Sequence, residues 1–374
     1  MSSPEDRKID VSMDMGKGEG DAPARPNPPP PPPKADPTAS SSQEAAQATG
    51  KGLDIGTANL LSATQSPDGQ TIIKVQRNAF IDIDSDDFTR NMLTKLNIQY
   101  VLVSNRMLVI GDPAFDLANV LNKETRRPMQ HGLISPNEVD ALPIEKLLLE
   151  SVLGTPQVEN EVVYFSVPAE PIDSEANVIY HKGLFEGILK KMGYNGKSLL
   201  EGHAVVFAEM AEQDFTGIGI SCGGGMFNIC VSYKTIPCLS FSTSRGGDWI
   251  DENVAKVLGI KSSRATALKE KGVDITNAKN REEEAIEIYY RNLINYTLVN
   301  IKQRFESSEG MPNFPDPVDI VLAGGTSMIG GFTETVRDEL KSLEFPIPIR
   351  EVRRAEDPLT SVCRGALVAA VSEE

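Results

Sequence analysis

The chain has 374 residues and a formal net charge of −16, from 37 Lys and Arg against 53 Asp and Glu. Such an acidic chain is poorly suited to the phosphate backbone of a nucleic acid, so we expect no nucleic-acid partner. With 40% hydrophobic residues the sequence can form two or three domains with substantial cores, and no apolar run is long enough to predict a membrane span.

The first 49 residues are rich in proline, with an unbroken run at residues 28–33. A segment of this composition buries little apolar surface, so we predict a disordered tail in which the proline run is a stiff spacer. The tail either only solubilises the chain or docks on a groove of an adaptor, a mode that polyproline favours. Residues 1–15 lack both an apolar helix face and a signal-peptide pattern, so we expect a cytoplasmic protein with no direct membrane anchor.

From residue 50 onward, strand and helix patterns alternate. In the first half we predict strands at 72–75, 100–103, 107–110 and 162–167, and helices at 144–152 and 178–192. The second half repeats this plan, with strands that begin at Gly217, Met226 and Ile236 and a long helix at 281–306. The repetition predicts an α/β fold of two related lobes, at residues 50–215 and 216–374.

Three glycine-rich segments interrupt the pattern, at residues 54–59, 221–225 and 323–327. The first two each join two strands, so they predict tight hairpins whose bare backbone can approach a phosphate. The third is predicted to open a helix that spans residues 330–343. One such turn alone is more often structural, but three in this order indicate a nucleotide held between two lobes.

Asp54 ends the strand that leads into the first hairpin. No Gly-Lys-Ser/Thr follows it, so this segment is not a P-loop. A carboxylate that faces a phosphate is favourable only with a hard cation between them, normally Mg²⁺ with its water shell. We therefore predict that Asp54 holds a magnesium ion.

With these motifs the chain resembles the bacterial actin-like ATPases of the MreB and MamK type, within the superfamily of actin, sugar kinases and heat-shock chaperones. Residues 54–59 are similar to the first phosphate motif of that family, residues 127–134 to its R-P-x-x-x-G-x-I segment, and residues 323–325 to its adenosine motif. Residues 357–366 resemble the segment that leads the last helix back to the first lobe. The resemblance implies two duplicated actin-like, ribonuclease H-like lobes with a nucleotide cleft between them.

The resemblance also implies an ATP site with Mg²⁺ and assigns roles to individual residues. It implies the following nucleotide-binding residues: Asp54, Gly56, Thr57, Ala58, Asn59, Gly223, Gly224, Gly225, Asp248, Lys269, Glu270, Gly324, Gly325 and Thr326. Lys269 and Glu270 correspond to a charged pair beside the base, although such neighbours also occur on solvated helix faces. Glu201 corresponds to the catalytic acidic residue that positions the attacking water; the alternative is an ordinary Glu at a helix N-terminus.

The second hairpin departs from the family pattern D-x-G-x-G-T-T, because Ser221 replaces the acidic residue and Met226 the first hydroxyl. A serine brings no charge to hold the cation, so we expect nucleotide binding to survive better than hydrolysis. The predicted function is a Mg-ATP-dependent cytoskeletal protein that polymerises with itself into head-to-tail filaments and hydrolyses ATP slowly. The alternatives are a nucleotide-binding scaffold that scarcely hydrolyses ATP and a small-molecule kinase of the same fold.

Overall fold

The structure, a computed structural model, describes residues 50–373 except 99, 104, 122 and 139. The predicted proline-rich tail, residues 1–49, lies outside the described residues. The described chain forms two compact units, a smaller one of residues 82–108 and a larger one that contains the remainder. Within the described part, none of the helices is long and apolar enough to cross a membrane.

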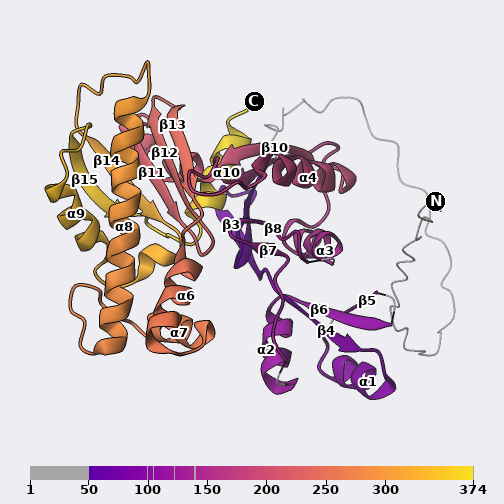
Figure 1. The fold of residues 1–374 in the computed structure, drawn as a ribbon. Helices are drawn as coiled ribbons and strands as arrows, with labels where there is room; N and C mark the ends of the chain where they lie inside the picture. Colours follow the sequence, from indigo (N-terminus) through magenta and orange to yellow (C-terminus); the bar gives the residue numbers. More distant parts are fainter. Residues whose placement is uncertain (1–49, 99, 104, 122, 139, 374) are drawn as a thin grey trace, which may run out of the picture. The chain divides into compact units, whose positions relative to one another are not determined.

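Two five-stranded sheets form the framework of the larger unit (Figure 1). The strands of the first sheet are β1 (Gly50–Ile55), β2 (Asn59–Gln65), β3 (Thr71–Arg77), β9 (Val162–Val167) and β10 (Asn195–Leu200). The strands of the second sheet are β11 (Gly217–Cys222), β12 (Phe227–Tyr233), β13 (Ile236–Thr243), β14 (Val318–Ala323) and β15 (Ile349–Arg354). We refer to each sheet with the helices that cover it as the first lobe and the second lobe.

The two sheets have the same topology. Their orders are β10-β9-β1-β2-β3 and β13-β12-β11-β14-β15, so that β1 corresponds to β11 and β9 to β14. In each sheet three antiparallel strands are followed by two strands that run parallel to the first one. The central strands β11 and β14 are buried along their whole length, which matches their nearly continuous apolar sequences. The structure thus shows an internal duplication.

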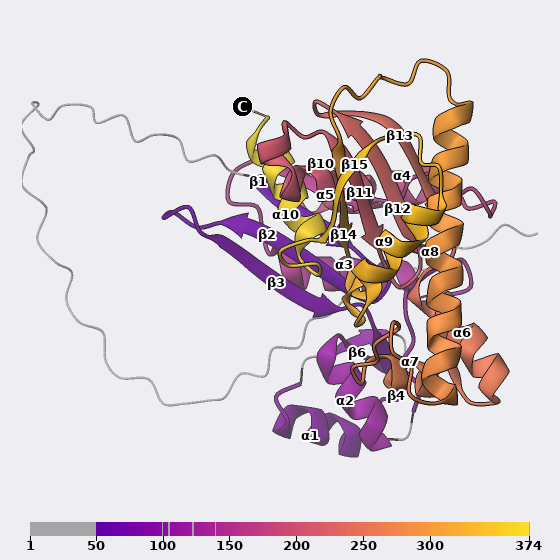
Figure 2. The same cartoon turned by 90° about the vertical axis from the view of Figure 1, so that its left-hand side faces the viewer.

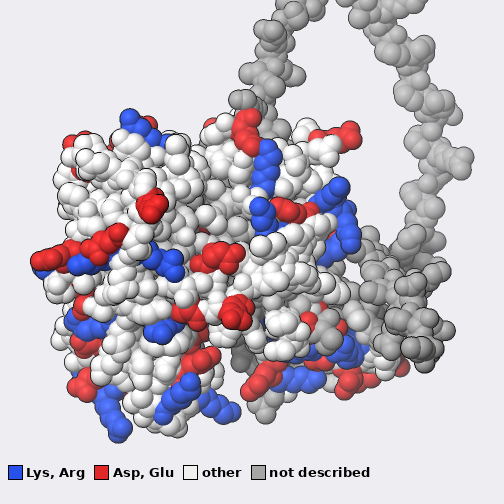
Figure 3. All heavy atoms as spheres, turned by 45° about the horizontal axis from the view of Figure 1, so that its top comes forward, with Lys and Arg blue, Asp and Glu red and all other residues white. Residues whose placement is uncertain are grey.

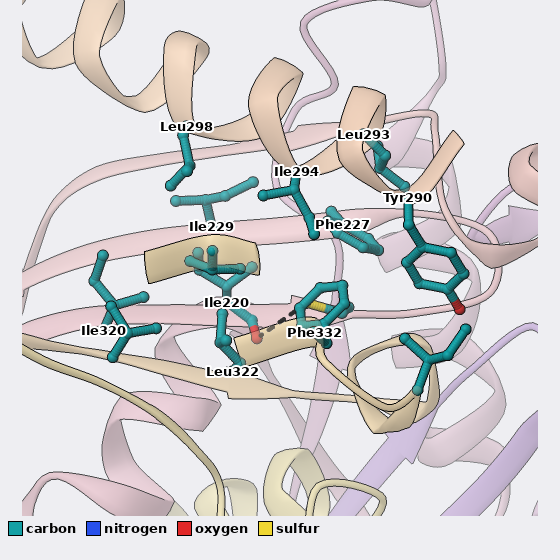
Figure 4. Packing of buried hydrophobic residues seen from close by; sticks show 14 of the residues in the cluster. Ile220, Phe227, Ile229, Tyr290, Leu293, Ile294, Leu298, Ile320, Leu322 and Phe332 are labelled. Carbon is teal, nitrogen blue, oxygen red and sulfur yellow. Dashed lines mark hydrogen bonds between the residues drawn. The ribbon is translucent and has the colours of Figure 1, made fainter. Parts of the chain in front are cut away.

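Helices cover one face of the second sheet, and Figure 4 shows the side chains buried between that face and one of these helices. The elements of this lobe are α6 (Gly247–Leu258), α7 (Ser262–Lys269), α8 (Arg281–Ser307), the short 3₁₀ turn η2 (Gly325–Met328) and α9 (Phe332–Ser342). Ile294 and Leu298 of α8 point toward the sheet, where Phe227 and Ile229 of β12 lie (Figure 4). The ring of Tyr290 packs edge-on against that of Phe332 of α9 in the same buried cluster. Asn280 caps α8 by accepting hydrogen bonds from the next turn. The buried cluster between α8, α9 and β12 forms a core of the second lobe.

The first sheet is covered by helices of the first half of the chain and by the C-terminal helix. The elements of the first lobe are α2 (Asp112–Leu121), β7 (Met129–Gln130), β8 (Leu133–Ile134), α3 (Ala141–Leu153) and α4 (Val178–Lys191). The next helical elements along the chain are α5 (Glu201–Glu209) and the 3₁₀ turn η1 (Ala211–Gln213), and α5 packs on β11 and β12 of the second sheet. The last helix, α10 (Ser361–Val371), packs against β1 and α5, which Figure 2 shows from the side. The last helix thus lies on the first sheet.

The smaller unit is built around a short sheet of order β4-β6-β5. It comprises β4 (Phe80–Asp84), α1 (Asp87–Lys95), β5 (Val101–Val103) and β6 (Arg106–Ile110), of which β4 and β6 also extend into the larger unit. Arg106 pairs with Asp82 across the sheet at 2.9 Å. Asp86 caps α1, because its side chain accepts a hydrogen bond from the backbone of Thr89.

The predicted strands and helices are confirmed, with ends that shift by a few residues. The helix predicted at residues 330–343 is α9, and the short 3₁₀ turn η2 lies between it and Gly324. Gly331, in the left-handed conformation with a φ of 77°, separates the two. The predicted boundary between the lobes at residues 215 and 216 stays a prediction.

Candidate functional site

A cavity of about 520 Å³ lies between the first and second lobes of the larger unit. This volume is within the range of about 300–1,000 Å³ that is usual for small-molecule sites. The cavity is lined by every predicted site residue: Asp54, Gly56, Thr57, Ala58, Asn59, Glu201, Gly223, Gly224, Gly225, Asp248, Lys269, Glu270, Gly324, Gly325 and Thr326. The structure therefore brings together residues that are as far as about 270 positions apart in the sequence. Their individual roles stay predictions.

The two glycine hairpins are built in the same way. In the first, the backbone N–H of Gly56 donates to the carbonyl of Asn59 at 3.0 Å; in the second, that of Gly223 donates to Met226 at 2.9 Å. Asp54 and Ser221 each stand two residues before the first glycine of their turn. They are therefore equivalent positions of the duplicated fold, and only the first of them carries a charge.

The hairpins meet across the cavity at Gly225. A Cβ at this position would lie 2.4 Å from the backbone nitrogen of Gly132 and 2.8 Å from the hydroxyl of Thr57. The same hydroxyl accepts a hydrogen bond from the Gly132 N–H at 3.0 Å. Because any side chain at position 225 would force these segments apart, the close contact of the two lobes depends on this glycine.

Two carboxyl groups face the cavity from opposite lobes of the duplicated fold. Asp54 accepts a hydrogen bond from Ser166 at 2.9 Å, and Glu201, the first residue of α5, accepts one from Ser221 at 3.0 Å. Burial raises the pKa of both carboxyl groups, and the charge of Asp54 raises the pKa of Glu201 further. A cation beside them would oppose both effects, because it stabilises the ionised forms.

The donor set of the cavity fits a magnesium–nucleotide complex better than a metal bound by protein alone. Among the described residues, no three His, Cys, Asp or Glu side chains are grouped as metal ligands. Mg²⁺ at nucleotide sites typically takes one or two carboxylates and completes its shell with phosphate oxygens and water. Asn228 also lines the cavity, and its side-chain amide lies next to the carboxyl group of Glu201, where it favours the ionised form and so opposes the rise in pKa that burial causes.

Lys269 and Glu270, the pair predicted to lie beside the base, have different environments. Lys269, whose side chain is only 14% exposed, lies 2.8 Å from Asp251 and also donates to the carbonyl of Gly247. It is therefore part of the cavity wall rather than of a solvated helix face. Glu270, the C-cap of α7, lines the cavity but is exposed.

The third glycine segment contains one structural glycine and one with space beside it. Gly324 has a φ of 86°, and a Cβ there would lie 2.4 Å from the carbonyl oxygen of Cys222. At Gly325 the nearest atom to such a Cβ would be a methyl carbon of Leu359 at 3.5 Å, an ordinary contact. The hydroxyl of Thr326 donates to the carbonyl of Gly223 at 2.9 Å, which ties this segment to the second hairpin.

Several residues of the site were not predicted from the sequence. Ser166 bonds to Asp54 because β9 lies parallel to β1, so that both strands end at the same edge of the sheet. Arg127 lies 3.6 Å from Asp248 across the cavity. The parallel pairing of β1 and β9 could have pointed to Ser166, but no local pattern marks the pairing of Arg127.

On the face that Figure 3 shows, acidic and basic side chains are interspersed, and no broad basic area is visible there. The expectation of no nucleic-acid partner stays a prediction.

The duplicated sheets, the returning helix and the glycine-bordered cavity define an actin-like fold. A chain of the MamK double helical filament is 21% identical, with a TM-score of 0.67 and coverage of 86% of this chain and 98% of that one. MreB5 of Spiroplasma citri bound to AMPPNP is 16% identical, with a TM-score of 0.60 and coverage of 84% and 93%. The predicted actin-like fold is thus confirmed.

The chain belongs to the Volactin family, whose sequence model matches residues 50–370. No curated protein matches it significantly in sequence.

Proposed function

We propose that this chain binds Mg-ATP in the cavity between its lobes and polymerises with itself, head to tail, into cytoplasmic filaments. The observation that carries the proposal is the convergence of three glycine segments and the carboxyl groups of Asp54 and Glu201 on one cavity. Backbone N–H groups of such turns bind phosphates, and a carboxylate beside them fits a metal ion.

Proteins of the same fold support both parts of the proposal. MreB5 is described with bound AMPPNP and with bound ADP, and MamK as a double helical filament. A ligand that contacts both lobes favours the state in which they are closed, to the extent that it binds this state better. Head-to-tail contacts between closed chains use two different surfaces and continue without limit, which produces a filament.

Different residues of the cavity bind the phosphates, the metal ion and the nucleoside. The two hairpins bind the phosphates through their backbone, Asp54 orients the water shell of the ion, and Gly325 lies against the nucleoside. Mg²⁺, when bound, neutralises phosphate charge. Glu201 at the start of α5 accepts a hydrogen bond from the attacking water and thereby orients it.

A nucleotide-binding scaffold with very slow hydrolysis is the second candidate, and a specific contact favours it. Ser221 donates a hydrogen bond to one carboxyl oxygen of Glu201 at 3.0 Å, which occupies that oxygen. Met226 is buried at the position where the family pattern has a hydroxyl. Both features weaken the polar surroundings of an attacking water while they leave the glycine backbone intact.

Calorimetric titration with Mg-ATP tests the binding proposal directly. The matched variant is Asp54→Asn, which keeps the shape of the side chain and an acceptor for Ser166 but removes the charge. We expect wild-type protein to bind ATP more tightly with Mg²⁺ than with a chelator, and the variant to lose this difference. Equal affinities of the two proteins for Mg-ATP would contradict the metal role of Asp54.

The proline-rich tail is proposed as a binding segment for an adaptor. Deletion of residues 1–49 tests this role, since filaments of the shortened chain should form in vitro but fail to recruit the adaptor in cells. Failure of the shortened chain to bind Mg-ATP would contradict the assignment of the cavity to residues 50–373 alone.

A further inference from the structure

Glu145 is an acidic residue that the structure buries completely beneath the first hairpin. It belongs to α3, which packs on β2 and β3, and its exposed fraction is 0%. Asn78, directly after β3, is equally buried. A charged side chain is almost never buried to this degree without a partner, so the surroundings of Glu145 require an explanation.

Asn78 connects this carboxyl group to the hairpin. Its side-chain Nδ2 donates to the carbonyl of Gly56 at 3.0 Å and to Oε1 of Glu145 at 2.9 Å. Its backbone N–H donates to the carbonyl of Ala58 at 2.9 Å. Asn78 thus holds two carbonyl groups of the first hairpin, and Glu145 fixes the orientation of the amide that does so.

The remaining oxygens of this pair both lack a hydrogen-bond partner among the residues that the structure describes. They are Oε2 of Glu145 and Oδ1 of Asn78, both buried. Two acceptors cannot bond to each other, but a proton on Oε2 turns the carboxyl group into a donor. A protonated carboxyl group and an amide then form a pair with two hydrogen bonds, in which neither oxygen is left unpaired.

The charges around α3 agree with a neutral acid. Burial raises the pKa of Glu145 to about 8. Of the two strands on which α3 packs, β2 has no titratable side chain, and the titratable side chains of β3, Lys74 and Arg77, are exposed. Arg77 is paired with Asp112 at 3.1 Å. Within α3 itself, the remaining charged residues pair with each other, Lys146 with Glu150.

We propose that Glu145 is a neutral carboxylic acid that forms a two-hydrogen-bond pair with Asn78 and thereby positions the first hairpin for phosphate binding. Glu145 is then a positioning residue, which acts on the nucleotide only through Asn78 and Gly56. This inference rests on the proposed nucleotide site for its effect on affinity, but the existence of the pair does not depend on it.

Two variants of the full-length chain separate pairing from simple space filling. Glu145→Gln has an amide N–H where the acid has its O–H, so it can form the same two bonds; Glu145→Met fills the space but forms neither. We expect Glu145→Gln to retain most of the Mg-ATP affinity. Glu145→Met should bind on the order of 10-fold more weakly, because the buried amide of Asn78 loses both hydrogen bonds to position 145 and keeps only the one to Gly56. Equal affinity of the two variants would overturn the proposal.

The pH dependence provides a readout that a purely structural residue would not change. Between about pH 7 and about pH 9 the acid loses its proton, so the Mg-ATP affinity of the wild type should fall relative to Glu145→Gln. The thermal stability of the wild type should also fall relative to that of Glu145→Gln as the pH rises. A folded-state pKa above the unfolded value of 4.5 means that stability is lost as pH rises from about 5 through about 8. Parallel pH profiles of the wild type and Glu145→Gln would contradict the proposal.

Infrared spectroscopy without nucleotide tests the pair by itself. At neutral pH, Glu145→Gln should show a weaker carbonyl stretch of protonated carboxylic acid than the wild type, by the contribution of one group; Glu201, whose pKa is also raised by burial, contributes equally in both proteins. Absence of a difference between the two proteins would refute the neutral acid. If the difference is present but the wild type does not bind Mg-ATP, the pair stands and the proposed nucleotide function fails.

Discussion

Replacement of Ser221 by aspartate tests why this chain should hydrolyse ATP slowly. Ser221 is equivalent to Asp54 in the duplicated fold, and its hydroxyl donates to Glu201 at 3.0 Å. Ser221→Asp restores the acidic residue of the family pattern. With Mg-ATP bound, the added charge should help to hold the metal and its water shell and release Glu201 to orient the attacking water. We expect phosphate release to become faster by about 10- to 100-fold, the size of effect that groups around a metal usually have.

The same substitution should destabilise the metal-free protein. It replaces a hydrogen bond to a buried carboxyl group by a second carboxyl group, so the two must share a proton. Loss of the donor alone costs roughly 1–3 kcal/mol. Ser221→Ala is the matched control, since it loses the same donor without adding a charge. Its stability should fall by a similar amount, but its rate of phosphate release should not rise.

The assay is phosphate release under saturating Mg-ATP, run beside thermal unfolding with and without Mg²⁺. Addition of Mg²⁺ and nucleotide should recover the stability of Ser221→Asp more than that of Ser221→Ala. If the wild type already releases phosphate quickly and Ser221→Asp changes nothing, slow hydrolysis does not result from this position. A gain in Ser221→Ala as large as in Ser221→Asp would show that charge is not the cause.

The other predictions concern the remaining residues of the site and one buried histidine. Asp54→Ala should weaken Mg-ATP binding by about 10- to 100-fold in calorimetric titration, and wild-type affinity would remove this residue from the site. Glu201→Ala should lower the remaining phosphate release by about 10²- to 10⁴-fold while nucleotide binding persists; an unchanged rate would exclude a catalytic role. Gly325→Val should weaken nucleotide binding with an unchanged circular dichroism spectrum. Gly324→Ala should instead lower the unfolding temperature, because only at position 324 does the added Cβ meet a backbone carbonyl oxygen, at 2.4 Å. The reverse pattern would refute the assignment of Gly325 to the nucleoside. Burial lowers the pKa of His181 to about 4 from 6.5, so the stability of the wild type relative to His181→Gln should fall as pH drops from about 6.5 to about 4, and identical acid unfolding curves would contradict this.

Much of the fold could be predicted because local patterns and the final structure agree. The buried strand at 162–167 and the long helix at 281–306 have strong apolar patterns, and the structure places β9 and α8 there. The exception is the third glycine segment. Gly331 has a left-handed backbone, so the chain turns once more before α9 begins. A glycine in a sequence does not reveal the sign of its φ, and this turn could not be foreseen.

The composition of the cavity could be predicted, but its internal contacts could not. Three glycine-rich turns in this order indicated a nucleotide site, and the resemblance to actin-like ATPases supplied the other residues that the structure brings to the cavity. Glu145 and Asn78 have no such pattern, since one belongs to an ordinary helix and the other to a strand end, 67 positions apart. Only the packing of α3 on β3 brings them together, and such long-range pairs are determined by the tertiary structure.

Sedimentation of the full-length protein with Mg-ATP, with Mg-ADP and without nucleotide tests the central claim most directly. Filaments that depend on a closed, nucleotide-bound state should pellet with Mg-ATP and remain in the supernatant without nucleotide. Slow hydrolysis predicts that the ATP pellet persists well after a fast ATPase would have disassembled. Equal amounts of protein in the pellet under all three conditions, or none under any of them, would contradict nucleotide-dependent polymerisation.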